Sequence, residues 1–373
     1  MTAPAQHIDS ILRSDTGSML AVGRACPVVI STRIRLARNL AGHRFPACSS
    51  SSQRIAVLNE CLAACERAPS IGGASVLRID DLSSLERLIL VERYLISREL
   101  MNSKGQAGVV ADPQKGASVM INEEDHLRIQ MLCIGFDLHG IWTRINTLDD
   151  ELEAHLDYAF SRRLGYLTSC PTNLGTAIRA SAMMHLPGLV LAGYMEQVIR
   201  MVNQLGIAVR GHFGEGSEAT GSIFQISNQQ TLGEDEETII NRLHNVLESV
   251  IEQEMNARQT LMEEKPDKLL DKIGRARGVL QNGHRLSSEE AMEMLSLTRL
   301  AADMGALPEG WRATVDNLMV VTQPGHMQYR AQAEIGPSRR DVLRANIMRE
   351  EFANMPPLTN NSNYSEVMNS LED

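Results

Sequence analysis

Short apolar runs, each bounded by turn-forming residues, recur through the first two thirds of the chain. Apolar or alternating side chains over about four to eight residues are typical of β-strands. The runs that predict strands are residues 28–34, 108–111, 118–121, 127–133, 207–210 and 222–227. The second, third and fourth follow one another closely, which indicates a meander, so we expect an antiparallel sheet.

Helical spacing of apolar residues, three and four apart, fills much of the sequence between these strands. Pro187 should end or kink one such segment, because its ring removes a backbone donor. Since strands and helices do not alternate strictly, the sequence predicts an α+β fold in which helices flank the antiparallel sheet. The predicted helical segments are residues 53–67, 85–100, 137–160, 178–205 (interrupted) and 234–264.

Pro266 lies just beyond the long predicted helix over residues 234–264, and we place a domain boundary there. The segment that follows is rich in helix formers, with Ser287 and Ser288 placed to cap a helix. The tail of the chain is rich in Pro, Asn and Ser, a composition typical of disorder. The predicted parts are an N-terminal extension (1–27), a sheet domain (28–265), a small helical domain (266–354) and a disordered tail (355–373).

The chain has 373 residues and a formal net charge of −10, with 43% hydrophobic and 22% charged residues. These values are ordinary for a soluble globular protein, and the negative charge argues against nucleic acid as a partner. We find no N-terminal secretory signal and no apolar run long enough to span a bilayer, so a cytoplasmic location without membrane contact is expected. The six cysteines include no C-x-x-C pair, which argues against a zinc or redox site and favours reduced thiols.

Residues 165–181 are interpreted as the stretch around which the sheet domain is organised. They begin as a short strand-like run, break at Cys170 and Pro171, and continue into an Ala- and Met-rich segment, read as helix, that carries Arg179. Proline after Cys170 keeps that cysteine extended, so its thiol is expected to point across a cleft. Taken alone, the stretch fits a buried small hydrophobe beside a tight turn equally well.

Further stretches place unusual polar residues beside predicted strands. Residues 122–126 put four ionisable side chains between apolar runs, where a strand would alternate. Residues 210–218 follow a strand-like run and are too glycine-rich for a helix. Arg33, Arg35 and Arg38 add three cations in a short span, which by themselves would fit a solvated basic face.

The sequence lacks the phosphate-binding loop G-x-x-x-x-G-K-[ST] and the protein-kinase pattern H-R-D-x-x-x-x-N. If a nucleotide is used, other groups must therefore hold its phosphates. Arginine is suited to this task, because its planar fork donates paired hydrogen bonds to phosphate oxygens and stays charged at any working pH.

Four stretches, taken in order, resemble the catalytic-domain motifs of the phosphagen (guanidino) kinase family. The closest similarity is to the bacterial protein-arginine kinases of that family, and it extends from about residue 28 to residue 344. The four stretches are STRIRLARN (31–39), NEEDHLR (122–128), SCPTNLGTAIRAS (169–181) and VRGHFGEGSEATG (209–221).

The resemblance implies an antiparallel sheet flanked by helices, with ATP and Mg²⁺ as cofactors and no metal ligands from the protein itself. It implies that Glu124 and Glu215 are catalytic carboxylates that orient the acceptor guanidinium, one of them accepting its proton. Cys170 would be a thiolate that adjusts the charge of the acceptor without being a nucleophile. Arginines would grip the phosphates, and loop backbone amides of residues 31–35, 179–183 and 210–215 would add donors. The implied nucleotide-binding residues are Ser31, Thr32, Arg33, Ile34, Arg35, Tyr94, Arg128, Arg179, Ala180, Ser181, Ala182, Met183, Arg210, Gly211, His212, Phe213 and Gly214.

Two features depart from the family pattern. Tyr94 stands where much of the family has a histidine near the nucleotide base, and tyrosine can also stack on adenine. In addition, kinases of free creatine or arginine carry a helical domain before the first motif, whereas this chain reaches Ser31 with little before it. We therefore expect an open acceptor site that suits an arginine side chain on a protein.

Residues 340–345 fit the pattern R-D-x-x-R-A, which in the protein-arginine kinases forms a phosphoarginine-binding pocket with allosteric effect. The residues concerned are Arg340, Asp341, Arg344 and Ala345. On a helix the two arginines would lie one turn apart on one face, able to grip a phosphorylated guanidine. Without the resemblance, a solvated basic face is the simpler interpretation.

Our first hypothesis is an ATP-dependent kinase of arginine side chains in proteins, marking damaged or regulatory proteins for proteolysis. Its implied partners are proteins with exposed arginines, an activator similar to McsA, a Clp-type ATPase or protease, and a second copy of the chain in a homodimer or larger oligomer. A kinase of free arginine or another guanidino metabolite is the first alternative. A non-catalytic phosphoarginine-binding adaptor is the second.

Overall fold

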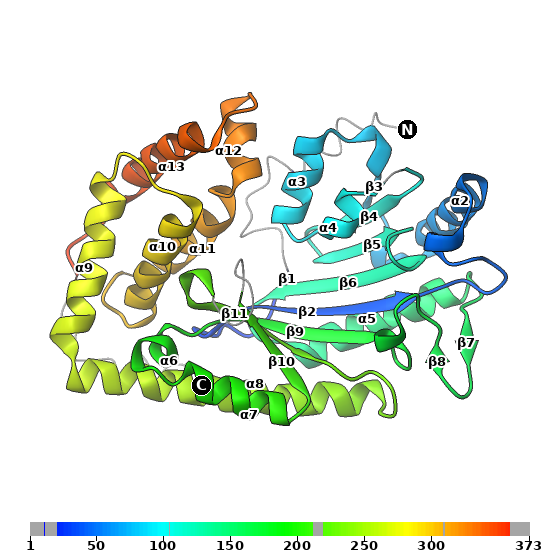
Figure 1. Cartoon of the computed structure of the whole chain (residues 1–373), viewed down its shortest axis with the longest axis horizontal. Coiled ribbons are helices and arrows are strands. Elements are labelled where there is room, and N and C mark those ends of the chain that lie inside the picture. Colours follow the sequence, from blue (N-terminus) through cyan, green and yellow to red (C-terminus); the bar gives the residue numbers. More distant parts are fainter. Residues whose placement is uncertain (1–10, 12–20, 104, 212–218, 309, 359–373) are drawn as a thin grey trace.

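The computed structural model describes residue 11 and residues 21–103, 105–211, 219–308 and 310–358. At its centre lies one sheet with the strand order β10-β11-β9-β2-β6-β5-β4-β3, antiparallel throughout, and β1 joins β6 in parallel (Figure 1). The α+β prediction is confirmed. The strands are β1 (Ala21–Val22), β2 (Val29–Arg38), β3 (Ser75–Arg78), β4 (Gly108–Asp112), β5 (Ala117–Ile121), β6 (Leu127–Ile134), β9 (Ile178–His185), β10 (Ile207–Gly211) and β11 (Ile223–Asn228).

Helices cover one face of the sheet along its length. Helices α5 (Leu138–Glu153) and α8 (Glu236–Glu264) pack beneath the central strands, and α2 (Ser51–Arg67) lies beside them (Figure 1). Ile34 and Leu36 of β2 are fully buried in the resulting core. Because strand side chains alternate, Arg33 and Arg35 of the same strand point to the opposite face.

Among the described residues, helices cover the opposite face toward its two ends. Helices α3 (Ser84–Glu92) and α4 (Arg98–Met101) pack over β3, β4 and β5, where Met120 contributes to their core. The C-terminal helices pack over the other end, where Met183 of β9 contacts their core. Met120 lies directly opposite Arg128, and Met183 lies directly opposite Ser31, which shares its face of β2 with Arg33. Met120 and Met183 therefore lie on the same face of the sheet as these arginines. A strip of sheet around β2, β6 and β9 lies between these two covers in the described part of the chain.

The prediction of one helix over residues 85–100 is wrong in one respect. Tyr94 adopts the left-handed conformation with φ of 59°, which ends α3 and separates it from α4. The amides of Leu95 and Ile96 turn back to the carbonyl oxygen of Leu90 and so close the helix end. Helical spacing in the sequence runs through this break, since Leu95, Ile96 and Leu100 are all buried.

The prediction of helical material from residue 178 is also wrong. Residues 178–185 form strand β9, which pairs with β2 on one side and β11 on the other. Ala180, Ala182 and Met184 are buried with a period of two, but alanine and methionine are helix formers and hid that pattern. Pro187 begins a helix, α6 (Pro187–Ala192), where its missing N–H is not needed.

The remaining elements complete the two parts of the chain. The C-terminal helices have their own apolar core, and Ser287 caps α10 as predicted, accepting from the Glu290 amide. The helix break at Lys265 falls at the predicted boundary, while the limits of the predicted parts stay predictions. These elements are β7 (Phe160–Ser161), β8 (Gly165–Tyr166), α7 (Met195–Gln204), α9 (Pro266–Asn282), α10 (Ser288–Asp303), α11 (Trp311–Val321), α12 (Pro324–Ala331), α13 (Pro337–Phe352) and the short 3-10 turns η1 (Pro46–Cys48), η2 (Pro69–Ile71), η3 (Ile79–Asp81), η4 (Pro171–Asn173) and η5 (Thr220–Ser222).

A buried ion network joins the sheet to the C-terminal helices. Glu254 of α8 accepts from the first amides of α6 and pairs with Arg258 at 2.6 Å. Asp303 of α10 receives both Arg258 and Arg299. Arg299 also donates to Nδ1 of His185, the last residue of β9. Each buried charge thus has an opposite charge beside it, as burial requires.

A second contact joins α3 to α12. The carboxylate of Glu92 accepts from the amides of Gly325 and His326 and from Nδ1 of His326. Arg93 donates to Nε2 of the same imidazole. His326 is thus held from both ring nitrogens, by Glu92 at Nδ1 and by Arg93 at Nε2.

Burial, with Arg299, Arg258 and Arg312 nearby, lowers the pKa of His185 well below its ordinary 6.5. In the unfolded chain this histidine takes up a proton as pH falls below about 6.5, while in the folded protein it does not, so the free energy of unfolding should fall with pH there. We expect a loss of about 1 kcal/mol per pH unit from this residue. Denaturant unfolding at about pH 7.5 and about pH 5.5 measures it.

The variant His185→Asn keeps an acceptor for Arg299 and should show a smaller loss of stability on acidification. The matched control is His155→Asn, because His155 is exposed, and it should behave as the wild type does. An equal acid loss in His185→Asn and the wild type would contradict the prediction.

Candidate active site

Four arginines come from three neighbouring strands to one face of the sheet. Arg35 of β2 lies directly opposite Arg179 of β9, and Arg33 opposite Ser181. Arg128 of β6 lies opposite Ala37, which is in line with Arg33 and Arg35. All four arginines are half-buried. The structure therefore brings together, on the strip between the two covers, four arginines whose positions in the sequence range from 33 to 179.

The electrostatics of this face are unfavourable without a bound anion. Like charges directly opposite on paired strands are destabilising, as at Arg35 and Arg179. Burial lowers the pKa of Arg33 to about 10, with Arg128 and Arg179 adding to the effect. It also lowers the pKa values of Arg35 and Arg179. A polyphosphate group would relieve this repulsion.

One carboxylate among the described residues offsets part of this charge. Glu123 accepts from Arg128 at 2.5 Å and also from the hydroxyl of Ser97, and its charge acts to raise the pKa of Arg35. Nε of Arg35 is buried without a hydrogen-bond partner in the described structure. A buried donor without a partner is destabilising, so this face retains the capacity to bind an acceptor-rich ligand.

Two polar partners of the arginines were missed from the sequence. Arg33 donates to Gln225 at 3.4 Å and Arg179 to Ser227 at 3.3 Å. Both partners lie on β11 and alternate with buried Phe224 and Ile226. That alternation of polar and apolar residues was the available signal for a polar strand face.

The expectation of free backbone amides at residues 31–35 and 179–183 is wrong. These residues are not loops but parts of β2 and β9, which are paired on both sides, so their backbone groups already serve the sheet. Thr32, Ile34, Ala180 and Ala182 point into the core. Of these stretches, the side chains on the arginine face are those of Ser31, Arg33, Arg35, Arg179, Ser181 and Met183.

Tyr94 lies at the edge of the arginine face. Its left-handed backbone conformation directs it there, and its carbonyl oxygen accepts from Gln130 of β6 at 2.6 Å. Burial raises the pKa of its phenol to about 12, although the charge of Arg33 acts in the opposite direction. The ring is therefore neutral and adjoins the cations, a position that suits a base beside phosphates. Its contact with adenine stays a prediction.

The loop over residues 122–126 is hydrogen-bonded to the loop of residues 167–177 between β8 and β9, called the Cys170 loop below. Asp125 accepts from Asn39 and from the amide of Ser169, whose hydroxyl donates to the carbonyl oxygen of Glu124. Asp125 and His126 are buried, and they support the loop. These bonds place Glu124 and Cys170, 46 residues apart in number, on neighbouring loops.

Glu124 has the properties of a proton acceptor. Glu124 is exposed overall, but the partial burial of its carboxyl raises the pKa of that group. The nearby charge of Asp125 raises it further. A raised pKa makes a carboxylate a better base near neutral pH. Glu124 lines a cavity of about 450 Å³ together with Arg54, Glu99 and Arg128. The cavity is large enough for an arginine side chain to approach Glu124.

Cys170 is half-buried at the start of η4, and its Sγ lies 2.9 Å from Oγ1 of Thr172. It is accessible, in contrast to the buried hydrophobe that the sequence also allowed. Arg210 is exposed and Gly211 ends β10. The predicted residues His212, Phe213, Gly214 and Glu215 lie outside the described residues.

The predicted phosphoarginine residues lie on α13. Arg340 and Asp341 are half-buried, but Arg344 and Ala345 are buried. The guanidinium of Arg344 donates to the carbonyl oxygens of Thr322 and Leu286, to Ser288 and to Asp341. Arg344 therefore does not present a free fork beside Arg340, and it orients Asp341 from within the domain.

No three His, Cys, Asp or Glu side chains in the described ranges are grouped to hold a metal ion. In the same ranges, no helix has the length and apolar character needed to cross a membrane.

Comparisons with known proteins connect this geometry to two protein families. The family described as ATP:guanido phosphotransferase, C-terminal catalytic domain, matches residues 58–257. The family described as protein-arginine kinase McsB C-terminal domain matches residues 266–363. Similar proteins include a protein-arginine kinase of Pelotomaculum thermopropionicum, 43% identical over 91% of this chain and 96% of its own length. A second, from Geobacillus thermodenitrificans, is 45% identical over 87% of this chain and 90% of its own length.

Solved structures agree on the fold. The duplicated taurocyamine kinase of Schistosoma mansoni, with bound transition-state analogue components, matches with a TM-score of 0.56 at 26% identity. The match covers 69% of this chain and 38% of that one. A lombricine kinase structure matches with a TM-score of 0.56 at 24% identity, over 67% of this chain and 71% of its own, and shows the fold alone.

We expect Arg179→Gln to separate stability from ligand binding. Removing the cation opposite Arg35 should raise the melting temperature of the unliganded protein or leave it unchanged. Loss of a charge-assisted hydrogen bond should weaken ATP binding by about tenfold or more. Calorimetric titration and thermal unfolding measure the two effects. Arg200→Gln is the control, since Arg200 is 71% exposed on α7, and it should change neither. A less stable variant with unchanged ATP affinity would contradict our interpretation of this face.

Proposed function

The chain belongs to the ATP:guanido phosphotransferase family, as one of its protein-arginine kinases, and we propose that its arginine-lined sheet face binds ATP for phosphoryl transfer to arginine side chains of proteins. One observation carries this proposal. Arg35 and Arg179, both cationic, are held directly opposite each other beside further arginines, an arrangement whose charge repulsion a bound polyanion would relieve.

The phosphates of ATP bind across Arg33, Arg35, Arg128 and Arg179, with Arg210 at the rim. Their forked donors pair with phosphate oxygens and stabilise the charge that spreads over the transferred group. A magnesium ion held by the nucleotide neutralises part of the phosphate charge when bound. Tyr94, beside Arg33, packs against the base.

The acceptor is a guanidinium, which is a weak nucleophile because its lone pair is delocalised and its pKa exceeds about 12. Glu124 and Glu215 hold it from two sides and favour a localised lone pair at the reacting nitrogen. That nitrogen forms the bond to phosphorus, the bond to the ADP oxygen breaks, and the guanidinium proton passes to a carboxylate. The raised pKa of Glu124 fits this role. Cys170, on the loop bonded to Glu124, adjusts the charge of the acceptor and forms no covalent intermediate.

The deciding experiment incubates the protein with ATP and either an unfolded arginine-rich protein or free arginine. Acid-labile phosphate on each acceptor is then measured. Phosphate on the protein alone, or far faster there, supports the proposal. Phosphate on free arginine alone would show a metabolite kinase, and binding of phosphoarginine without any turnover would show an adaptor.

Glu124→Gln should lower turnover by about 100-fold or more, the usual effect of removing a general base, while ATP still binds. Glu215→Gln should do the same. Glu66→Gln, an exposed change on α2, is the control for the loss of one carboxylate and should keep full activity. Turnover by Glu124→Gln near the wild-type rate would exclude this carboxylate as the base.

The regulatory part of the proposal concerns the C-terminal helices. Phosphoarginine binds at Arg340 and Asp341, with Arg344 and Ala345 supporting them from within the domain. The protein acts in the cytoplasm as a dimer or larger oligomer. An activator similar to McsA and a Clp-type ATPase or protease are the proposed partners, and phosphorylation marks damaged or regulatory proteins for proteolysis.

Arg340→Ala should abolish phosphoarginine binding outside the active site, and any activation by it, while the single-turnover rate stays unchanged. Arg344 is avoided in this test because its removal would leave buried carbonyl groups without donors. Calorimetry with free phosphoarginine and activity assays measure the effect. Arg339→Ala, the exposed neighbour, is the control. Undiminished binding and activation in Arg340→Ala would identify this helix face as solvated charge.

A further inference from the structure

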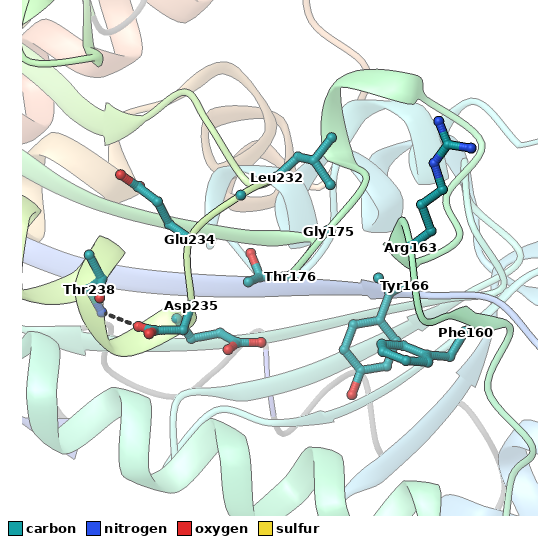
Figure 2. Close-up of a pocket in the computed structure, with 12 residues that line it drawn as sticks. Phe160, Arg163, Tyr166, Gly175, Thr176, Leu232, Glu234, Asp235 and Thr238 are labelled. Atoms are coloured by element: carbon teal, nitrogen blue, oxygen red, sulfur yellow. Dashed lines mark hydrogen bonds between the residues drawn. The ribbon is translucent and has the colours of Figure 1, made fainter.

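A second cavity, of about 590 Å³, borders the Cys170 loop at Gly175 and Thr176. Its walls are the β7–β8 hairpin, the end of the loop at Gly175 and Thr176, and the first turn of α8. Figure 2 shows the rings of Phe160 and Tyr166 on one side and the acidic residues Glu234 and Asp235 on the other. None of these side chains takes part in the proposed reaction.

The aromatic wall is exposed and already shows what it can bind. Phe160 is 58% exposed, which is unusual for so large an apolar side chain, and packs edge-on against Tyr166. The guanidinium of Arg38 lies 3.5 Å from the centre of the Tyr166 ring and pairs with Asp149 at 2.6 Å. On the inner side of the aromatic wall, the guanidinium of Arg38 thus already lies between the Tyr166 ring and the carboxylate of Asp149.

The opposite wall supplies carboxylates. Glu234, Asp235 and Glu236 line the cavity, against one lining cation, Arg163. A hydrogen bond from the amide of Thr238 lowers the pKa of Asp235, so it is ionised. One oxygen of Glu234 accepts from Arg242, while its other oxygen is buried and has no hydrogen-bond partner among the described atoms. Aromatic rings facing carboxylates form a site for a cation with an apolar stem.

The cavity adjoins the acceptor site through one loop. Thr231 donates to the carbonyl oxygens of Thr172 and Leu174, which ties the Cys170 loop to the segment that enters α8. Gly175 approaches that segment so closely that an added Cβ would lie 2.0 Å from the carbonyl oxygen of Thr231. Gly175 follows Cys170 by five positions, so their Cα atoms are at most about 18 Å apart.

We propose that this cavity is a subsite for a lysine or arginine side chain of the substrate protein, about four or five residues from the arginine that is phosphorylated. An extended peptide advances about 3.4 Å per residue, so a chain whose target arginine reaches Glu124 and Cys170 brings such a residue to the cavity. The stem of the basic residue packs on Phe160, and its charge faces Glu236 and Glu234. The inference rests on the proposed function, because it assigns a second contact to the same substrate.

Steady-state kinetics on a peptide series test the proposal. Each peptide carries one target arginine and, four or five residues away on either side, a lysine, a glutamine or a glutamate. We expect kcat/KM to be about tenfold higher with lysine than with glutamine at the preferred side, mostly through KM, the size given by one cation–aromatic contact and one exposed ion pair. Equal values for all three flanking residues would overturn the proposal.

Two variants change the walls independently. Glu236→Lys should reverse the preference toward glutamate, and Phe160→Ala should reduce it severalfold, while both keep the wild-type rate on the glutamine peptide. Glu237→Gln, on the same helical turn but outside the cavity, is the control and should keep the preference for lysine. A preference unchanged in both variants would place the recognition elsewhere and overturn the assignment.

Binding measurements separate this inference from the proposed function. A peptide with citrulline in place of the target arginine cannot be phosphorylated, yet it should still bind more tightly with the flanking lysine than with glutamine. That difference should vanish in Glu236→Lys. If no peptide is phosphorylated but the lysine-dependent binding is present, the subsite stands and the proposed reaction fails. If phosphorylation occurs without that binding difference, the reaction stands and the subsite fails.

Discussion

Repulsion between Arg33, Arg35, Arg128 and Arg179 is the interaction that the rest of the structure must hold in check. These guanidinium groups lie half-buried on neighbouring strands, and burial lowers the pKa of Arg33 to about 10. Isolated strands could not keep Arg35 and Arg179 opposite each other, because like charges in that position weaken strand pairing. The sheet can do so because β2 and β9 are central strands, each paired on both sides, and their other face is buried under α5 and α8. The apolar core therefore stabilises an arrangement that is unfavourable until an anion binds.

The two groups of helices above the sheet relate differently to this face. The C-terminal helices are joined to the sheet by the ion network of Glu254, Arg258 and Arg299, in which each charge has a partner. The arginine face has the reverse balance, since among the described residues one carboxylate, that of Glu123, offsets it. One protein thus contains a neutralised charge cluster that fixes its architecture and an unneutralised one that binds ligand. The contact of Glu92 with His326 connects the two covers above that face, close to Tyr94.

Much of the fold could be predicted from the sequence, because β2, β4, β5 and β6 show apolar runs bounded by turns. Strand β9 could not, since its inward residues, Ala180 and Ala182, are helix formers, and only pairing with β2 and β11 selects the strand. The site residues came from resemblance to a family. Periodicity could not supply them, because the meeting of Arg35 with Arg179 depends on register between strands far apart in sequence. The buried direction of Arg344 was equally inaccessible, since acceptors from two other segments determine it, Thr322 after α11 and Leu286 and Ser288 at the start of α10.

The register of β2 also limits how this chain can change during evolution or engineering. Arg33 and Arg35 alternate with Ile34 and Leu36, which are fully buried. Inserting or deleting one residue upstream in this strand would move the arginines into the apolar core and the aliphatic side chains onto the ligand face. Substitutions can adjust the site one side chain at a time, but length changes in β2 would remove binding and stability together. Variation in length is therefore confined to surface turns, such as the one between β4 and β5, where Gln114 is exposed.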